Sequence, residues 1–217
     1  YGYSRNTSPN LVRLTKTSRT YTNAYSTSGW TPPAHASLFS GLFSASHKAT
    51  QENYILSNDV DTLAEVLSDH GYETIGISEN PMVSTGTNFH QGFDKFYETW
   101  KVKSPNPKVN QGYLFLKKQL RDRNSNEPFF LFFNFIEAHS PYNSSRQFRK
   151  RFVSNPKLRS NNHKLVPYYL GKKKFSKAEI THLEELYDAE ICYVDHYIGK
   201  IVKVLKNYRL WEDTVFI

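Results

Sequence analysis

Apolar and polar positions along the chain follow two periods, one typical of helices and one typical of strands. Five stretches are typical of helices, because their apolar residues recur every three or four positions or because capping residues, prolines and glycines bracket them. The longest of them starts at a capping Ser176 and continues to Leu205. The other predicted helices span residues 8–14, 31–41, 61–70 and 113–121.

Short apolar runs between these helices predict strands. Thr74–Ser78 is one strand, and residues 129–136 are so apolar that we expect a central strand covered on both faces. Residues 21–25 and 213–217 are predicted as two further short strands. This order of helices and strands predicts an α/β sandwich with a largely parallel sheet. In such sheets ligands bind just beyond the carboxyl ends of the strands.

Length and cysteine content narrow the class of protein. A chain of 217 residues is long enough for one domain with a substantial core. Cys192 is the only cysteine, which excludes an intramolecular disulfide framework and a thiolate zinc cluster. A single cysteine fits a protein of a reducing compartment and slightly favours the cytoplasm. The chain contains no apolar run of about 18 residues, so we expect no membrane-spanning segment.

The net charge of +8 is concentrated in the middle third of the chain. Residues 101–174 contain 17 basic and 3 acidic residues, a net charge of +14, whereas each flanking segment has a net charge of −3. We interpret this stretch as an inserted loop region or small subdomain. Such a cluster is typical of a solvated face, and the alternative is attraction of an anionic substrate, nucleic acid or an acidic membrane.

Four residues are candidates for chemistry at strand ends and at one helix start. Thr31 lies at a helix N-terminus, where backbone N–H groups and the helix dipole suit an anion, although the residues alone also allow a simple cap. His35 follows one helical turn later. Asn80 follows the strand 74–78 and His139 follows the strand 129–136. The alternative for His35 is a solvated helix histidine, for Asn80 an Asn-Pro turn and for His139 a loop histidine.

The stretch Thr31-Pro32-Pro33-Ala34-His35, followed by Leu38 and Gly41, resembles the nucleophile motif of the sulfatases, a branch of the alkaline phosphatase superfamily. Thr31 aligns with the cysteine or serine that becomes formylglycine, and His35 aligns with the supporting arginine. Further blocks resemble the family in the same order, at residues 1–14, 23–25, 62–74, 92–94, 139–142 and 187–195. The resemblance implies an alkaline-phosphatase-like three-layer sandwich.

The threonine changes the chemistry that the resemblance implies, because threonine cannot become formylglycine. The implied activity is a metal-dependent hydrolase of sulfate or phosphate esters, with Thr31 as nucleophile and metal ligand. His35 is then a neighbouring donor, His139 a substrate contact or general acid, and Asn80 a contact to the oxyanion. One alternative is a transferase of the phosphoethanolamine or glycerol-phosphate type. Another is a degenerate member that binds polyanions.

The resemblance also implies metal ligands that this chain lacks. Family members bind their metal through an acidic pair that would precede Tyr1 and an Asp with His or Asn that would follow Ile217. We therefore expect residues 1–217 to be a partial catalytic domain, incomplete at both ends and inactive alone, with a basic insertion at about 101–174. Calcium is the first expectation, with magnesium, manganese or zinc as alternatives. The expected substrate is an anionic small molecule or glycan ester, no specific nucleic acid is expected, and the oligomeric state is left open.

Overall fold

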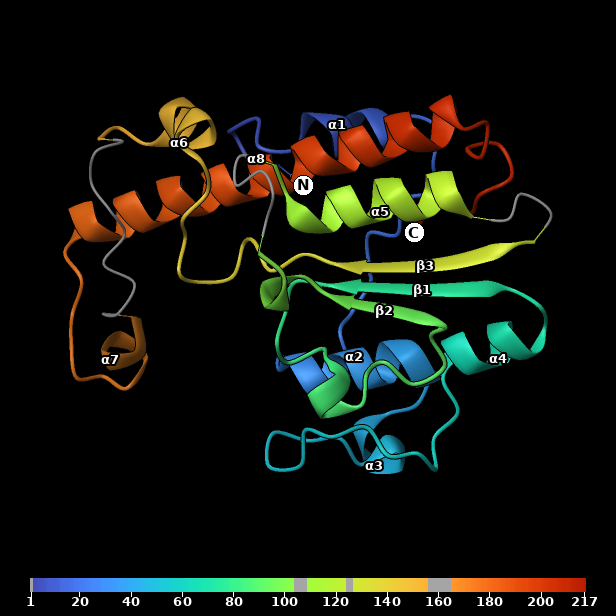
Figure 1. Ribbon diagram of the computed structural model, residues 1–217. Coiled ribbons are helices and arrows are strands. Elements are labelled where there is room, and N and C mark those ends of the chain that lie inside the picture. The colour runs from blue at the N-terminus through green and yellow to red at the C-terminus, as the bar shows by residue number, and fades with distance from the viewer. Residues whose placement is uncertain (1, 104–108, 124–126, 156–164) are drawn as a thin grey trace. The chain divides into compact units, whose positions relative to one another are not determined.

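The computed structural model describes residues 2–103, 109–123, 127–155 and 165–217 (Figure 1). Contacts divide the chain into two compact units. The sheet unit is Tyr21–Ile136. The helical unit combines Tyr1–Thr20 with Glu137–Ile217, so it is built from the two outer segments of the chain.

The sheet unit is built on three parallel strands in the order β2-β1-β3, which confirms the predicted parallel α/β sheet (Figure 1). Ser78, the last residue of β1, pairs with Glu98 of β2 and Asn134 of β3, so the three carboxyl ends are level. The buried central strand is β1. Within the described three-stranded sheet the Phe-rich β3, predicted as central, lies at the side of β1, and it is made of half-buried residues and ends two residues early. The strands are β1 Glu73–Ser78, β2 Lys95–Glu98 and β3 Phe129–Asn134.

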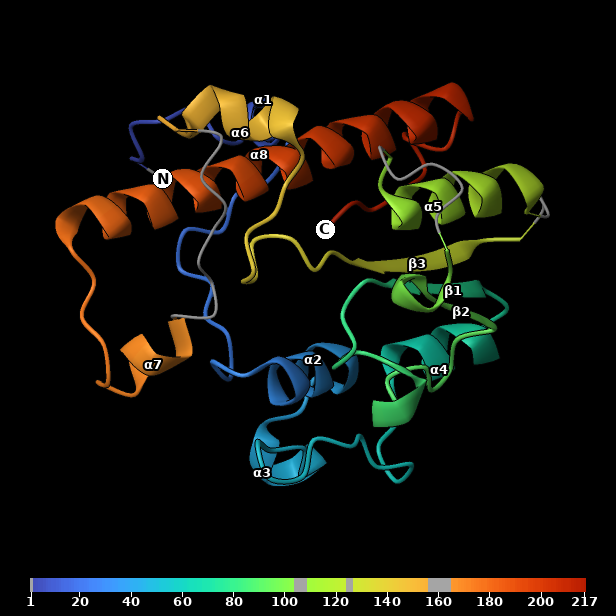
Figure 2. The ribbon, with the colours of Figure 1, turned by 60° about the vertical axis from the view of Figure 1, so that its left-hand side comes forward.

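Helices cover both faces of this sheet. Helices α2 and α4 lie on one face and α5 on the other, and Figure 2 shows the same three layers from a second direction. Helix α4 starts with a capping box between Thr62 and Glu65 and stops before Gly71, which adopts a positive φ. The bounds are α2 Thr31–Ser40, α3 Ser44–His47, α4 Leu63–Asp69 and α5 Gln111–Asp122, with short 3₁₀ turns at Thr85–Thr87 and Thr99–Lys101.

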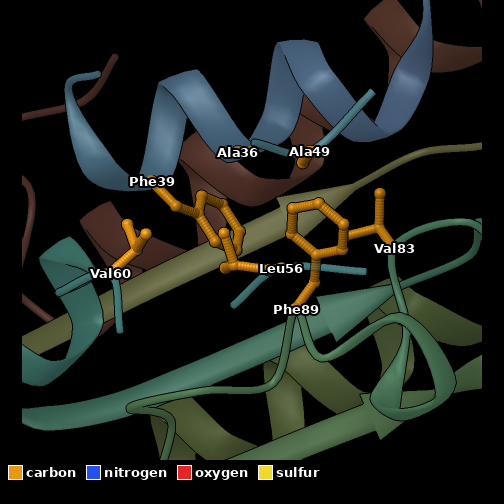
Figure 3. Packing of buried hydrophobic residues seen from close by; sticks show 7 residues of the cluster. All are labelled: Ala36, Phe39, Ala49, Leu56, Val60, Val83 and Phe89. Atoms are coloured by element: carbon orange, nitrogen blue, oxygen red, sulfur yellow. The ribbon is translucent and has the colours of Figure 1, made fainter. Parts of the chain in front are cut away.

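Aromatic packing attaches α2 to the sheet. Phe39 of α2 meets Phe89 at 5.7 Å and Phe132 of β3 at 4.8 Å between ring centroids, both edge to face. Around these rings lies a core of fully or nearly fully buried residues (Figure 3), namely Ala36, Phe39, Ala49, Leu56, Val60, Val83 and Phe89. The apolar run of β3 is therefore used partly to hold the helix that carries Thr31.

The helical unit is organised around α8 (Lys177–Asn207). Its predicted cap is confirmed, because the Ser176 side chain accepts from the Glu179 N–H in a capping box. Helix α6 (Arg146–Phe152) packs on α8 through Phe148, whose ring lies 5.3 Å from that of Tyr193. The other helices of this unit are α1 Pro9–Leu14 and α7 Leu165–Tyr169.

Four carboxylates of α8 are buried and accept hydrogen bonds from other segments of the helical unit. Asp188 accepts from the Tyr3 hydroxyl and the Arg5 guanidinium at 2.8–2.9 Å. Glu185 accepts from the Ser154 N–H and Glu190 accepts from the Ser144 N–H. Asp195 accepts from backbone N–H groups at the start of α1. The predicted apolar stripe of this helix fails at Ile180 and Tyr187, which are exposed. The buried face of α8 instead includes the four carboxylates, and their burial is tolerated because each accepts a hydrogen bond from a donor.

Two predicted strands are absent from the described residues. Residues 21–25 and 213–217 are irregular, and Tyr21, Tyr25 and Ile217 are exposed. Short β-prone runs form strands only when a neighbouring strand supplies hydrogen bonds, and neither run pairs in the described sheet.

The basic stretch 101–174 contains regular elements. Helix α5 and strand β3 belong to the sheet unit, whereas α6 and α7 belong to the helical unit. Lys157, Arg159 and Lys164 lie outside the described residues. Among the residues that are described, no helix is both long and apolar enough to cross a bilayer.

The cap of α1 yields a test of how the helical unit holds together. Ser8 occupies the predicted N-cap position, but its side chain makes no capping hydrogen bond. Asp195 instead accepts from the N–H groups of Asn10 at 3.0 Å and Leu11 at 2.8 Å. Asp195→Ala should lower the free energy of unfolding by about 2–4 kcal/mol, because it removes charge-assisted bonds of a buried carboxylate and leaves the first N–H groups of α1 without their acceptor.

Chemical denaturation of the 217-residue chain measures this loss. Ser8→Ala is the matched control and should change the free energy of unfolding by less than about 0.5 kcal/mol. A loss for Ser8→Ala as large as that for Asp195→Ala would contradict the assignment of the cap to Asp195 alone.

Candidate active site

Thr31 is the first residue of α2, and Trp30 occupies the N-cap position with extended backbone angles. The N-cap position therefore lies one residue before Thr31, so the alternative in which Thr31 only caps the helix does not hold. Pro32 and Pro33 follow, and since proline has no N–H, Thr31 carries the only N–H of the first three helical residues. This helix start thus presents fewer donors to an anion than we expected. Thr31 is half-buried, and its hydroxyl makes no hydrogen bond within the described ranges.

His35 joins the start of α2 to the end of β3. Its Nδ1 lies 2.8 Å from the backbone carbonyl oxygen of Thr31, one helical turn earlier. Its Nε2 lies 3.0 Å from the side-chain Nδ2 of Asn134, the last residue of β3. Because a carbonyl oxygen only accepts, Nδ1 donates, and Nε2 of the neutral ring then accepts from the Asn134 amide. The result is a chain of hydrogen bonds from Asn134 through His35 to Thr31.

The surroundings of His35 favour its neutral form. Phe39, Phe89 and Phe132 approach the imidazole edge to face, with centroids 6.2–6.5 Å away. Burial lowers the pKa of His35, against the opposing effect of its hydrogen bond to the Thr31 carbonyl. The lowered pKa indicates a neutral ring, and the two hydrogen bonds place its single proton on Nδ1.

Asn134 is a residue that sequence reasoning missed. Its Oδ1 is buried without a hydrogen-bond partner among the described residues, while its Nδ2 serves His35. A buried acceptor without a donor costs about 1–3 kcal/mol, and orphans of this kind collect at functional sites. The available signal was its place at the end of the Phe-rich strand, where a polar residue follows five apolar ones.

The end of β1 provides a second buried polar group that was not predicted, the Glu79 carboxylate. Its Oε1 accepts from Asn110 Nδ2 at 2.7 Å, and Asn110 also caps α5. The Glu79 N–H donates to the Asn134 carbonyl at 2.9 Å, so these two polar residues are neighbours at the carboxyl edge of the sheet. Glu79 therefore ties α5 to the strand ends.

Asn80, a predicted oxyanion contact, closes its own turn. Its Oδ1 accepts from the Met82 N–H at 2.9 Å, two residues later, and its N–H donates to the Ser78 hydroxyl at 3.1 Å. This is the geometry of an Asx turn beside Pro81. The amide oxygen of Asn80 is thus engaged within the turn, and its contact with an oxyanion stays a prediction.

His47 is fully buried in the sheet unit. Its Nδ1 accepts from the Ala49 N–H at 3.1 Å, so its Nε2 donates to the Ser37 hydroxyl at 3.0 Å. Burial lowers the pKa of this imidazole. These bonds join α3 to α2, which is a structural role.

His139 belongs to the helical unit, whereas Thr31, His35 and Asn80 belong to the sheet unit. The His139 ring is exposed, and its Nδ1 lies 2.5 Å from the carbonyl oxygen of Ser140. Ala138, directly before it, adopts a φ of 68°, in the left-handed region that a residue with a Cβ rarely occupies. Backbone strain of this kind is common where a side chain is held for function.

Metal ligands are sparse in the described part of the chain. Among those residues, no three His, Cys, Asp or Glu side chains are grouped so as to hold a metal ion. Calcium and magnesium each need several oxygen ligands, and Thr31 with its described neighbours does not supply them. The described residues therefore do not fit a divalent metal by themselves, and we derive no step through one.

The family is established by comparison with protein-family models. The Sulfatase model matches residues 1–217, so the chain belongs to the sulfatase family. Comparison with curated protein sequences gave no match.

Solved structures with the same fold include sulfatases and other members of the alkaline phosphatase superfamily. Phosphonate monoester hydrolase of Agrobacterium radiobacter matches with a TM-score of 0.77 and 17% identity, over 98% of this chain and 57% of that one. The periplasmic domain of EptC from Escherichia coli, in complex with zinc, matches at 0.66 and 18%, over 95% and 55%. The lipoteichoic acid synthase LtaP from Listeria monocytogenes matches at 0.60 and 20%, over 95% and 48%. This chain therefore spans about half the length of each, and the likeness establishes an alkaline-phosphatase-like fold.

The buried imidazole of His35 gives a prediction for the pH dependence of stability. Because the folded state holds His35 with a lowered pKa, it binds fewer protons than the unfolded state below about pH 6.5. The free energy of unfolding should therefore fall as the pH drops below that value, by at most about 1.4 kcal/mol per pH unit for this group. His35→Gln should remove this part of the slope.

Denaturation midpoints measured between neutral and mildly acidic pH provide the comparison. Leu38→Gln, at an exposed position of the same helix, is the control and should keep the parent slope. An unchanged slope in His35→Gln would contradict the burial of a neutral imidazole.

Proposed function

We propose that the protein is a sulfatase-family hydrolase of sulfate or phosphate esters in which the Thr31 hydroxyl is the nucleophile. The observation that carries this proposal is the position of Thr31 at the start of α2, with its hydroxyl free of hydrogen bonds within the described ranges. Membership of the sulfatase family and the matching position in its motif support the same role.

His35 acts in this proposal as a positioning residue. Its Nδ1–H holds the Thr31 carbonyl and its Nε2 is occupied by Asn134, so the ring has no free nitrogen to take the nucleophile's proton. The family arginine at this place is a cation, whereas His35 is neutral at pH 7 because burial lowers its pKa. His35 therefore fixes the backbone that carries the hydroxyl and adds no charge for the substrate anion.

The proposed reaction is an in-line displacement at sulfur or phosphorus. The Thr31 oxygen, having lost its proton, bonds to the central atom as the bond to the ester oxygen breaks, and the departing alcohol takes up a proton. Water then attacks the central atom of the covalent adduct, the bond to the Thr31 oxygen breaks and that oxygen takes up a proton. The product is sulfate or phosphate from a monoester, and a phosphate monoester from a diester. His139 and Asn80 remain proposed substrate contacts. The positive end of the α2 dipole favours the anionic group, although two prolines limit its N–H donors.

Metal dependence belongs to the proposal for the full-length protein. A metal would lower the pKa of the nucleophile and stabilise charge on the transferred group. Thr31 is the one ligand that we propose from residues 1–217, and calcium, magnesium, manganese and zinc remain candidates. The zinc in the EptC structure supports a divalent ion in a protein of the same fold.

A transferase is the second candidate, and the fold shared with lipoteichoic acid synthase LtaP supports it. The first half of the reaction is the same, and an acceptor alcohol replaces water in the second. Sulfate monoesters, phosphate monoesters and phosphate diesters, each assayed with and without an added alcohol, distinguish the two. Product that carries the added alcohol identifies a transferase. A hydrolase instead releases free sulfate or phosphate from a monoester, and a phosphate monoester from a diester.

Substitution of Thr31 tests the nucleophile. In the full-length protein, Thr31→Ala should lower kcat by at least about a thousandfold, because no oxygen remains to form the adduct. Thr31→Ser keeps the hydroxyl and should retain measurable turnover. Purified variants are compared on the best ester of the panel.

Ser37→Ala serves as a control, since Ser37 lies on the same helix but bonds His47. It should keep kcat within about threefold of the parent, a change of less than about 0.7 kcal/mol. Turnover by Thr31→Ala at the parent rate would rule Thr31 out as nucleophile.

A further inference from the structure

Helix α7 and the residues after it form a compact turn in the helical unit, which we call the α7 turn (residues 165–175). Gly171, with a φ of 68°, reverses the chain, and its N–H donates to the Tyr168 carbonyl at 2.9 Å. The Phe175 ring then stacks on the Tyr168 ring at 4.7 Å. Internal bonds and a ring stack thus give this short segment a defined shape.

One face of the α7 turn is apolar and exposed. Val166, Tyr169 and Leu170 are 65%, 77% and 61% exposed. They occupy positions i, i+3 and i+4, which share one side of a helix, whereas Leu165 is buried. Single exposed apolar residues are ordinary, but three adjacent large ones on one helix face indicate a surface that contacts another apolar phase.

Basic residues immediately follow this apolar face. Lys172 and Lys174 are exposed, while Lys173 lies 5.1 Å from the Phe175 ring and 3.5 Å from Glu179. The described stretch from 165 to 178 contains four lysines and no acidic residue. The α7 turn therefore carries positive charge and fits an anionic partner.

We propose that the α7 turn docks on a membrane surface that carries anionic phospholipids. Val166 and Leu170 would reach the acyl-chain boundary, and Tyr169 would lie at the interface, where an aromatic ring with a polar hydroxyl is favoured. Lys172 and Lys174 would contact the lipid phosphates. A nucleic acid explains the lysines but offers no apolar phase for the two aliphatic side chains, so the observations favour the membrane. This inference is independent of Thr31.

Vesicle co-sedimentation of the 217-residue chain tests the proposal. The two probes are vesicles of phosphatidylcholine alone and of phosphatidylcholine mixed with phosphatidylglycerol. The chain should bind the mixed vesicles and sediment little with the neutral ones, and the binding should weaken as salt rises.

Two sets of variants separate the apolar and charged contributions. Lys172→Gln with Lys174→Gln should weaken binding about twenty-five-fold, since each lysine near an anionic surface contributes about fivefold. Tyr169→Ser with Leu170→Ser should weaken binding by at least about tenfold, because the apolar burial is lost. All four positions are exposed, so circular dichroism should show an unchanged fold.

Arg146→Gln with Lys150→Gln removes the same charge from α6 and is the matched control, with an expected change of less than about threefold. Three results would overturn the proposal: no binding to mixed vesicles, no effect of the Tyr169 and Leu170 changes, or an equal loss in the α6 control. Binding to heparin or duplex DNA that equals vesicle binding and ignores the apolar changes would identify a general polyanion surface instead.

Discussion

A hydrogen bond from the Asn134 amide to the His35 ring is the constraint on which the geometry at Thr31 depends. Asn134 ends β3, and His35 in turn holds the Thr31 carbonyl, so the sheet edge fixes the first turn of α2. Three phenylalanine rings surround the imidazole and exclude water, which strengthens these bonds and keeps the ring neutral. The backbone of Thr31, which carries the hydroxyl proposed as nucleophile, is therefore held in place by His35, and His35 is held in turn by Asn134.

The sequence predicted the parallel α/β sheet, the cap at Ser176 and the family, because these depend on local periodicity and on motifs. It did not predict that β3 lies at the side of the described sheet, since apolar character does not distinguish an outer strand from a central one when a helix such as α2 covers it. Asn134 was missed because its partner His35 lies 99 residues away in sequence. Local pattern contains no information on such pairings.

Buried carboxylates explain why the long helix departs from its expected apolar stripe. Asp188 and Asp195 each bind a segment near the N-terminus of the chain, and Glu185 and Glu190 bind segments that precede α8. Each bond joins residues far apart in sequence, so helix periodicity alone reads these positions as exposed. Burial raises the pKa of Glu190, although the Ser144 N–H opposes it, so this carboxylate is held at a cost that its hydrogen bond offsets in part.

The ring state of His35 is the most direct test of this account. Long-range proton–nitrogen NMR correlation on the labelled 217-residue chain distinguishes the two neutral tautomers and the charged ring. The account predicts a neutral His35 at pH 7 with its proton on Nδ1 and an Nε2 that accepts a hydrogen bond, and Asn134→Leu should change the Nε2 resonance. A proton on Nε2, or a charged ring at pH 7, would contradict it.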